Sequence, residues 1–204
     1  MMSIRPAKAL VFLASLGPLA WLVWGAWSDL LGANPIEAVT RDTGTWTLRF
    51  LLLTLAITPL RRITGWNDAV RFRRMLGLFA FFYGSLHLLT YVWFDQFFDW
   101  PAMLKDVGKR PFITAGAAGF LLMLPLAATS TAGMIRRLGG RAWRRLHRLA
   151  YLAALAGVVH YWWLVKADIR LPRAYGVALA VLLGYRVAVA LRGRAGRDFG
   201  EQST

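Results

Sequence analysis

Six long apolar runs alternate with clusters of arginine along this chain, and no other feature limits its fold as much. The runs cover about residues 9–27, 46–60, 75–94, 112–129, 146–165 and 174–191. Each is near the ~20 residues that carry a helix across ~30 Å of hydrocarbon. Because lipid cannot pair with backbone N–H and C=O groups, each run is expected to form a transmembrane helix. The second run is short and is expected to borrow residues 43–45.

The composition indicates an integral membrane protein. Hydrophobic residues make up 57% of the 204 residues and charged residues only 17%, whereas soluble domains are about 45–50% apolar and about 25% charged. Such hydrophobicity excludes intrinsic disorder. The basic residues lie between apolar runs, which argues against a nucleic-acid-binding face. The chain has no cysteine, so disulfides, cysteine nucleophiles, iron–sulfur clusters and thiolate-bound metals are excluded.

The basic residues also predict the orientation in the membrane. The formal net charge is +15, and 16 Lys and Arg residues fall at the N-terminus, between runs two and three, between runs four and five, and in the tail, against seven on the other side. The positive-inside rule places the first group in the cytoplasm. We therefore predict an all-α integral membrane protein with six transmembrane helices and both termini cytoplasmic. It forms one domain over residues 1–204, with tails at 1–8 and 192–204, and its basic loops bind anionic lipid as a secondary role.

A signal peptide is the alternative interpretation of the first run, with Arg5 and Lys8 as its basic region. However, the run is longer than the ~7–15 residues of a signal core. It also ends in Trp24 and Trp27 instead of a small-residue cleavage site. The sequence therefore favours a first transmembrane helix.

The chain has three histidines, and all lie in or at the edge of apolar runs: His87, His147 and His160. An ionisable side chain inside a membrane span is costly, so it is by default a functional hypothesis. The alternative is a structural histidine that hydrogen-bonds across helices or faces a polar cavity.

His87 and His160 are predicted to lie at one depth. Runs three and five cross the membrane in the same direction, and the histidines follow Arg74 by 13 residues and Arg145 by 15 residues. Both therefore lie roughly 20 Å from the cytoplasmic arginines. Zinc fits poorly because no carboxylate or third histidine lies at that depth. Axial ligation of a haem iron needs only two histidines, so we predict a haem between runs three and five. Nearby residues suit a flat apolar macrocycle: Phe81, Phe82, Tyr83, Gly84 and Gly157.

His147 differs because it precedes His160 by 13 residues, which is roughly 20 Å along a helix and a different helix face. It is either a ligand of a second cofactor on the cytoplasmic side, such as a second haem, or a donor to a propionate or phosphate, or a basic interfacial residue. Arg73 and Arg74 match its depth on run three. These arginines either bind a haem propionate or a flavin phosphate or act as positive-inside anchors.

Between Leu31 and Leu191 the chain resembles the MsrQ family (formerly YedZ) of the ferric-reductase-like transmembrane superfamily. The resemblance depends on ordered segments: LGANPIE at 31–37, TGTWTLRFLLLTLAITPLRR at 43–62, RFRRMLGL at 71–78, LH at 86–87, KRPFITAG at 109–116, ATSTAGMIRRLGGRAWRRLHRLAYL at 128–152 and HYWWLVK at 160–166. His87, His147 and His160 occupy the three histidine positions of the family. Superfamily members with two haems use two histidines on each paired helix, and here Arg73 stands 14 residues before His87, which leaves a second haem open.

The resemblance implies a b-type cytochrome of the bacterial inner membrane. Such a protein takes electrons from the quinone pool, is associated with flavin mononucleotide, and passes electrons to a periplasmic molybdopterin methionine-sulfoxide reductase (MsrP-type) that repairs oxidised envelope proteins. The chain itself would be an electron-transfer subunit without sulfoxide chemistry. Two alternatives remain open: the membrane core of a ferric or other metal reductase, and a six-span transporter without haem.

Overall fold

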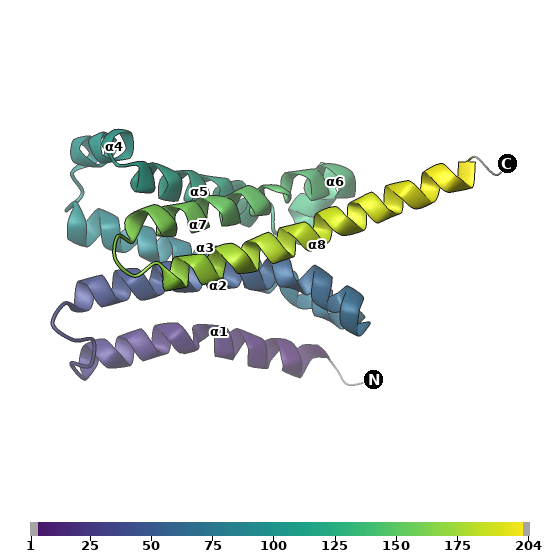
Figure 1. Ribbon diagram of the computed structural model, residues 1–204. Coiled ribbons are helices and arrows are strands. Elements are labelled where there is room, and N and C mark those ends of the chain that lie inside the picture. Colours follow the sequence, from purple (N-terminus) through teal and green to yellow (C-terminus); the bar gives the residue numbers. More distant parts are fainter. Residues whose placement is uncertain (1–3, 202–204) are drawn as a thin grey trace.

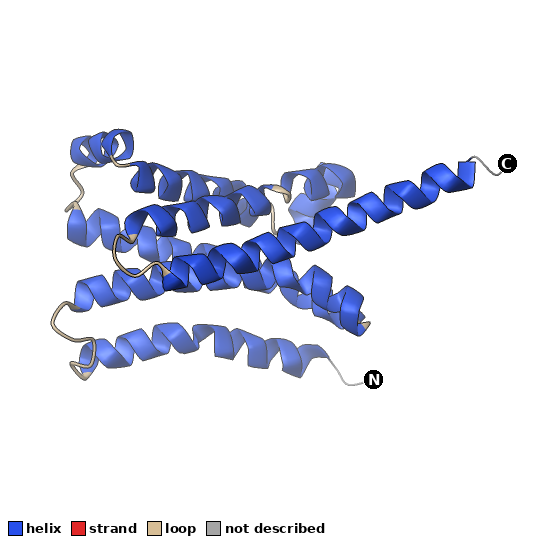
Figure 2. Cartoon of the chain, viewed as in Figure 1, coloured by secondary structure: helices blue, strands red, loops and turns tan. Residues whose placement is uncertain are grey.

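The computed structural model describes residues 4–201, with side chains described up to Arg192, and this part of the chain consists of helices and short connections (Figures 1 and 2). The predicted tail arginines Arg194 and Arg197 therefore lie outside the described side chains. The elements, in chain order, are α1 (Ile4–Trp27), α2 (Pro35–Thr64), the 3-10 turn η1 (Asn67–Ala69), α3 (Val70–Thr90), the π-helical turn η2 (Tyr91–Asp95), α4 (Trp100–Lys109), α5 (Pro111–Ala128), α6 (Ala132–Leu146), α7 (Leu149–Leu164) and α8 (Arg170–Glu201).

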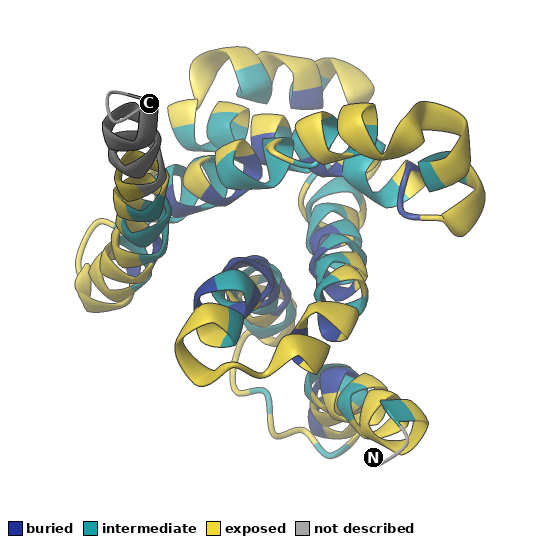
Figure 3. Cartoon of the chain, turned by 90° about the vertical axis from the view of Figure 1, so that its right-hand side faces the viewer, coloured by how far each residue is buried: buried dark blue, intermediate teal, exposed yellow. Residues whose placement is uncertain are grey.

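Among the described residues, four helical segments are long and apolar enough to cross a membrane: Ile4–Trp27, Asn67–Asp95, Pro111–Ala128 and Arg170–Arg192. Helix α7 is apolar but shorter. Large apolar side chains such as Leu13, Leu121 and Val181 are exposed on the outer helix faces, as Figure 3 illustrates for the outward surfaces. Many exposed apolar side chains are expected on a surface in contact with lipid. The all-helical membrane fold agrees with the sequence, while the count of six spans stays a prediction.

Helix α2 is longer than the second apolar run predicted. It has 30 residues, because the helix also includes polar residues that precede the apolar run, such as Arg41 and Asp42. The side chain of Asn34 accepts a hydrogen bond from the Glu37 N–H at 3.1 Å, and Pro35 follows it, which is a favourable helix start. Gly65 ends the helix in the left-handed conformation.

Two helices occupy segments that were expected to be loops. Helix α4 begins where the Asp99 side chain accepts from the Ala102 N–H, and helix α6 begins where Thr131 accepts from the Met134 N–H. Both helices are amphipathic, as helices at a membrane interface are. The expectation of loops was wrong here because an amphipathic helix has no continuous apolar run in its sequence.

Four helices form the centre of the molecule as two antiparallel pairs. Helix α2 packs along α3, and α5 packs along α7, with far less contact between α3 and α5 or between α2 and α7. Helices α3 and α7 therefore lie diagonally across the bundle. We call the boundary between the α2–α3 pair and the α5–α7 pair the seam. Helix α1 contacts α3 and α2, and α8 packs against α7 and α2.

The basic segments gather at one end of the bundle. Figure 1 shows the beginning of α1, the α2–α3 connection, α6 and the end of α8 on the right, and the α1–α2 connection, α4 and the α7–α8 connection on the left. The segments that the arginine count assigns to one side of the membrane therefore lie together.

Candidate functional site

His87 and His160 face each other across the seam. Their ring centroids are 5.9 Å apart and their planes are inclined by 75°. His87 lies in the last turn of α3, and His160 lies one turn before the end of α7. The structure therefore brings these two predicted residues together.

Each ring is held through the same nitrogen. Nδ1 of His87 lies 2.9 Å from the Thr40 carbonyl oxygen on α2, and Nδ1 of His160 lies 2.6 Å from the Phe112 carbonyl oxygen on α5. A carbonyl oxygen can only accept, so Nδ1 is the protonated nitrogen in both rings. Nε2 of each ring then keeps its lone pair. This is the usual state of a metal-binding histidine whose other nitrogen donates to a carbonyl.

The separation of the rings fits one metal ion between them. A metal bonded at about 2 Å to one nitrogen of each of two imidazoles separates the ring centroids by about 6 Å. Within residues 4–201 no group of three or more His, Cys, Asp or Glu residues could hold a metal, so this site supplies two protein ligands only. A haem iron needs two, because its macrocycle provides four nitrogens. The donor set therefore fits haem and does not fit structural zinc.

Small residues line the seam next to the histidines. A Cβ on Gly84 would meet Met123 at 2.9 Å and Thr47 at 3.4 Å, and a Cβ on Gly157 would meet Leu48 at 3.4 Å. These two predicted positions do lie where the helix pairs meet. Phe81 also crosses the seam and stacks on Phe120, with centroids 5.5 Å apart.

Tyr83 has a different role from the one expected beside a macrocycle. It is fully buried, and its hydroxyl accepts from the Leu19 N–H at 3.1 Å and donates to the Ser15 carbonyl at 2.8 Å. These groups flank Pro18 in α1, where a proline disturbs the helical hydrogen bonds. Tyr83 therefore attaches α1 to α3.

His147 is not part of the helix that contains His160. It follows the last residue of α6, and α7 begins only at Leu149, so the expectation of one straight helix through both histidines was wrong. The imidazole of His147 stacks on the Trp143 ring, with ring centroids 3.9 Å apart. Its Nε2 lies 3.1 Å from the Thr129 hydroxyl, which itself donates to the Pro125 carbonyl. The hydroxyl must therefore accept, and Nε2 of His147 is protonated.

The surroundings of His147 favour its neutral form. Burial, and then the positive charge of Arg73, lower the pKa of His147 below its usual value. Arg73 is half-buried at the start of α3, whereas Arg74 is exposed. The structure therefore brings His147 and Arg73 into one electrostatic environment and leaves Arg74 at the surface.

Two arginines inside the apolar runs escaped the sequence analysis. Arg186 on α8 donates to the Leu55 carbonyl at 2.5 Å and lies over the Tyr151 ring at 5.1 Å. Arg49 on α2 donates to the Tyr175 hydroxyl at 3.0 Å and lies over the Trp46 ring at 4.5 Å. A charge within a membrane span is itself a signal, and both positions could have been found from it. Both side chains connect α8 to the central helices.

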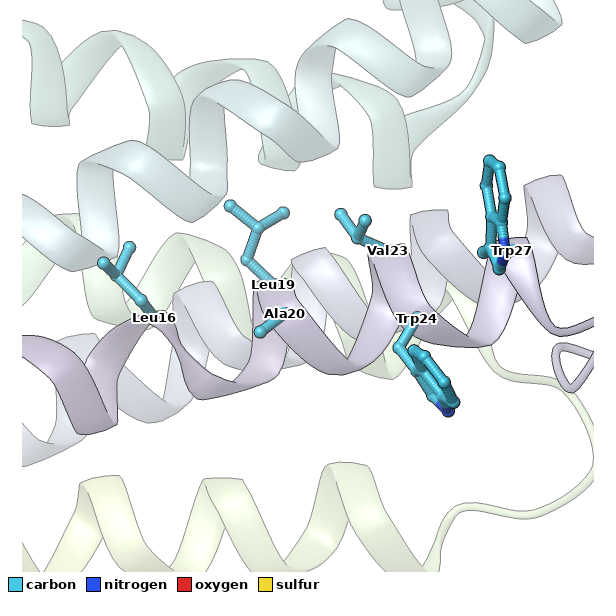
Figure 4. Close-up of a pocket in the computed structure, with 6 residues that line it drawn as sticks. All are labelled: Leu16, Leu19, Ala20, Val23, Trp24 and Trp27. Carbon is cyan, nitrogen blue, oxygen red and sulfur yellow. The ribbon is translucent and has the colours of Figure 1, made fainter.

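The described part of the chain has apolar grooves on its surface. One follows α1 and is lined by Leu16, Leu19, Ala20, Val23, Trp24 and Trp27 (Figure 4). In Figure 4, Leu16, Leu19 and Val23 point toward the neighbouring helix, and Trp24 projects to the other side. This groove contains no titratable side chain, so it is a lipid-facing surface instead of a reaction site.

The chain is similar to known membrane proteins. The family described as ferric reductase like transmembrane component matches residues 43–158. Relatives in Azospira oryzae (58% identical, covering 91% of this chain and 80% of the relative), Herminiimonas arsenicoxydans (55%, 92% and 87%) and Caulobacter vibrioides (55%, 90% and 90%) are each named protein-methionine-sulfoxide reductase heme-binding subunit MsrQ. The chain therefore belongs to the MsrQ family of ferric-reductase-like transmembrane proteins.

Proposed function

We propose that this protein is a membrane b-type cytochrome in which His87 and His160 are the axial ligands of one haem. The observation that supports it is the pair of rings 5.9 Å apart, each with Nδ1 bonded to a carbonyl oxygen. The relatives' name as heme-binding subunits points to the same group. When bound, haem supplies one-electron transfer.

The residues of the chain set the conditions for that chemistry. A carbonyl that accepts from Nδ1 fixes the ring orientation and raises the basicity of Nε2 as a ligand. The apolar seam, with Gly84, Gly157 and Phe81, excludes water around the ligands. Ligand identity, burial and hydrogen bonding are the means by which a protein adjusts the potential of a haem.

The direction of electron flow is the next part of the proposal. Electrons enter at the arginine-rich end, from the quinone pool directly or through flavin mononucleotide, and leave at the opposite end for a periplasmic molybdopterin sulfoxide reductase (MsrP-type). Arg73 and Arg74 are proposed partners of a propionate or a flavin phosphate, since guanidinium groups bind such anions with charge-assisted hydrogen bonds. His147 is proposed to serve the donor side, with a second haem as the alternative. The bacterial inner membrane is the proposed location.

The test is to purify the full chain and measure its haem content, flavin content and reduced spectrum. We expect one b-type haem that is six-coordinate and low-spin. His87→Ala and His160→Ala should each lose most of the haem absorbance and still insert in the membrane. Full haem retention in both variants would contradict the assignment. Absence of flavin would remove the flavin step and leave the haem assignment intact.

A further inference from the structure

Each of the two histidine rings at the seam rests on a glycine of a neighbouring helix. A Cβ on Gly44 of α2 would lie 3.0 Å from both Nδ1 and Cε1 of His87. A Cβ on Gly116 of α5 would lie 2.8 Å from Nδ1 and 3.0 Å from Cε1 of His160. At 2.8 Å, an alanine at position 116 would require the His160 ring to move, and at 3.0 Å an alanine at position 44 would press tightly against the His87 ring.

The same arrangement occurs twice because of helix geometry. The carbonyls that hold the rings belong to Thr40 and Phe112, which precede Gly44 and Gly116 by one helical turn. A helical carbonyl points along the axis toward the residue four positions later. A ring that bonds to this carbonyl must therefore lie over that later residue, and only glycine leaves room for it. The bonded residues are separated by 47 positions in one pair and by 48 in the other.

Two other helical glycines, Gly77 and Gly184, have no close neighbour. A Cβ on Gly77 would lie 3.8 Å from the Thr54 side chain, which is an ordinary contact, and one on Gly184 would meet nothing within 4 Å. Because alanine is favoured over glycine inside helices, these two positions provide matched controls for the same substitution.

We propose that Gly44 and Gly116 are positioning residues that clamp His87 and His160 against the Thr40 and Phe112 carbonyls, so that Nε2 of each ring faces the metal in a fixed orientation. The inference rests on the proposed haem site. It adds that α2 and α5 determine the orientation of the two histidine rings, although neither helix supplies a ligand. Each clamp acts on one axial ligand.

The experiment compares Gly44→Ala and Gly116→Ala with Gly77→Ala and Gly184→Ala in the full-length, haem-loaded protein. Insertion, monodispersity, haem content, low-spin absorbance and carbon monoxide binding to the reduced form are measured for all of them. We expect both clamp variants to lose most of the low-spin signal and to bind carbon monoxide, because a displaced histidine opens one coordination position. Gly116→Ala should show the larger loss because its contact is shorter. The control variants should match the wild type.

The outcomes separate this proposal from the haem assignment. A wild-type protein without low-spin haem would overturn the proposed function itself. A low-spin wild type together with unchanged spectra in both clamp variants would overturn the positioning role and leave the haem site standing. If both clamp variants fail to insert while the controls accumulate, the glycines serve helix packing and the proposal is wrong. If only one clamp variant inserts, loss of its low-spin signal supports the positioning role and an unchanged spectrum contradicts it.

Discussion

The three histidines differ in which ring nitrogen donates a hydrogen bond to the protein. His87 and His160 donate from Nδ1 to backbone carbonyls, whereas His147 donates from Nε2 to the Thr129 hydroxyl. The first arrangement leaves Nε2 free for a metal and the second leaves Nδ1. His147 therefore differs from the proposed ligand pair in its tautomer as well as in its position along the bundle.

We predict that His147→Ala keeps the haem of His87 and His160 but slows its reduction by quinol or reduced flavin. The reason is that His147 lies at the arginine-rich end, where the positive charge of Arg73 acts on its imidazole. Electron transfer from chemically reduced protein to the periplasmic partner should be nearly unchanged. Stopped-flow reduction kinetics and haem content provide the measurement. Thr129→Val is the control that removes the hydrogen-bond partner and keeps the imidazole.

Two results would contradict this prediction. Loss of all haem in His147→Ala would make His147 a ligand of the main haem or essential for folding. Unchanged reduction kinetics would make it an interfacial anchor, and the donor site would then lie elsewhere.

At the scale of elements, α1 depends on a single polar attachment. It contacts the bundle less than the central helices do, and the Tyr83 hydroxyl bridges Ser15 and Leu19 beside Pro18. The ring of Tyr83 also stacks on Phe50 with centroids 5.4 Å apart. Tyr83 therefore joins α1, α2 and α3.

We predict that Tyr83→Phe destabilises the protein by about 1–3 kcal/mol, the cost of leaving buried polar groups without a partner. The Leu19 N–H and the Ser15 carbonyl lose their bridge, while the aromatic stack remains. Unfolding in mixed detergent and protease cleavage between α1 and α2 measure the effect. Tyr185→Phe is the matched control, and equal stability of the two variants would show that packing alone holds α1.

At the scale of the whole molecule, the arginine-rich segments form one end of the bundle (Figure 1). A reporter fused after Thr204 should therefore read as cytoplasmic. A reporter inserted within residues 95–110, around α4, should read as periplasmic. Paired alkaline phosphatase and fluorescent-protein fusions measure both positions. A periplasmic C-terminus would contradict the positive-inside prediction and reverse the proposed direction of electron flow.

Much of the fold was predictable because lipid imposes a one-dimensional pattern on sequence. The helices α1 and α5 follow their apolar runs, and α8 contains its run but continues to Glu201. Each hydrocarbon crossing requires a long apolar helix. Helix α2 exceeded its run because polar residues on both sides of the run, such as Arg41 and Arg61, are also helical. The amphipathic helices α4 and α6 were missed for a related reason, since their polar faces resemble loops. The break at His147 also depends on contacts with Thr129 and Trp143.

The sequence by itself determined the helical membrane fold, the shared depth of His87 and His160, and the separate place of His147 at the basic end. These follow from hydropathy and a constant rise of ~1.5 Å per residue. Only the tertiary structure decided that α3 and α7 face each other diagonally, that Tyr83 serves α1, and that Gly44 and Gly116 lie against the two rings. Helix pairing and rotation come from contacts between residues far apart in the chain, and periodicity along one helix does not specify them.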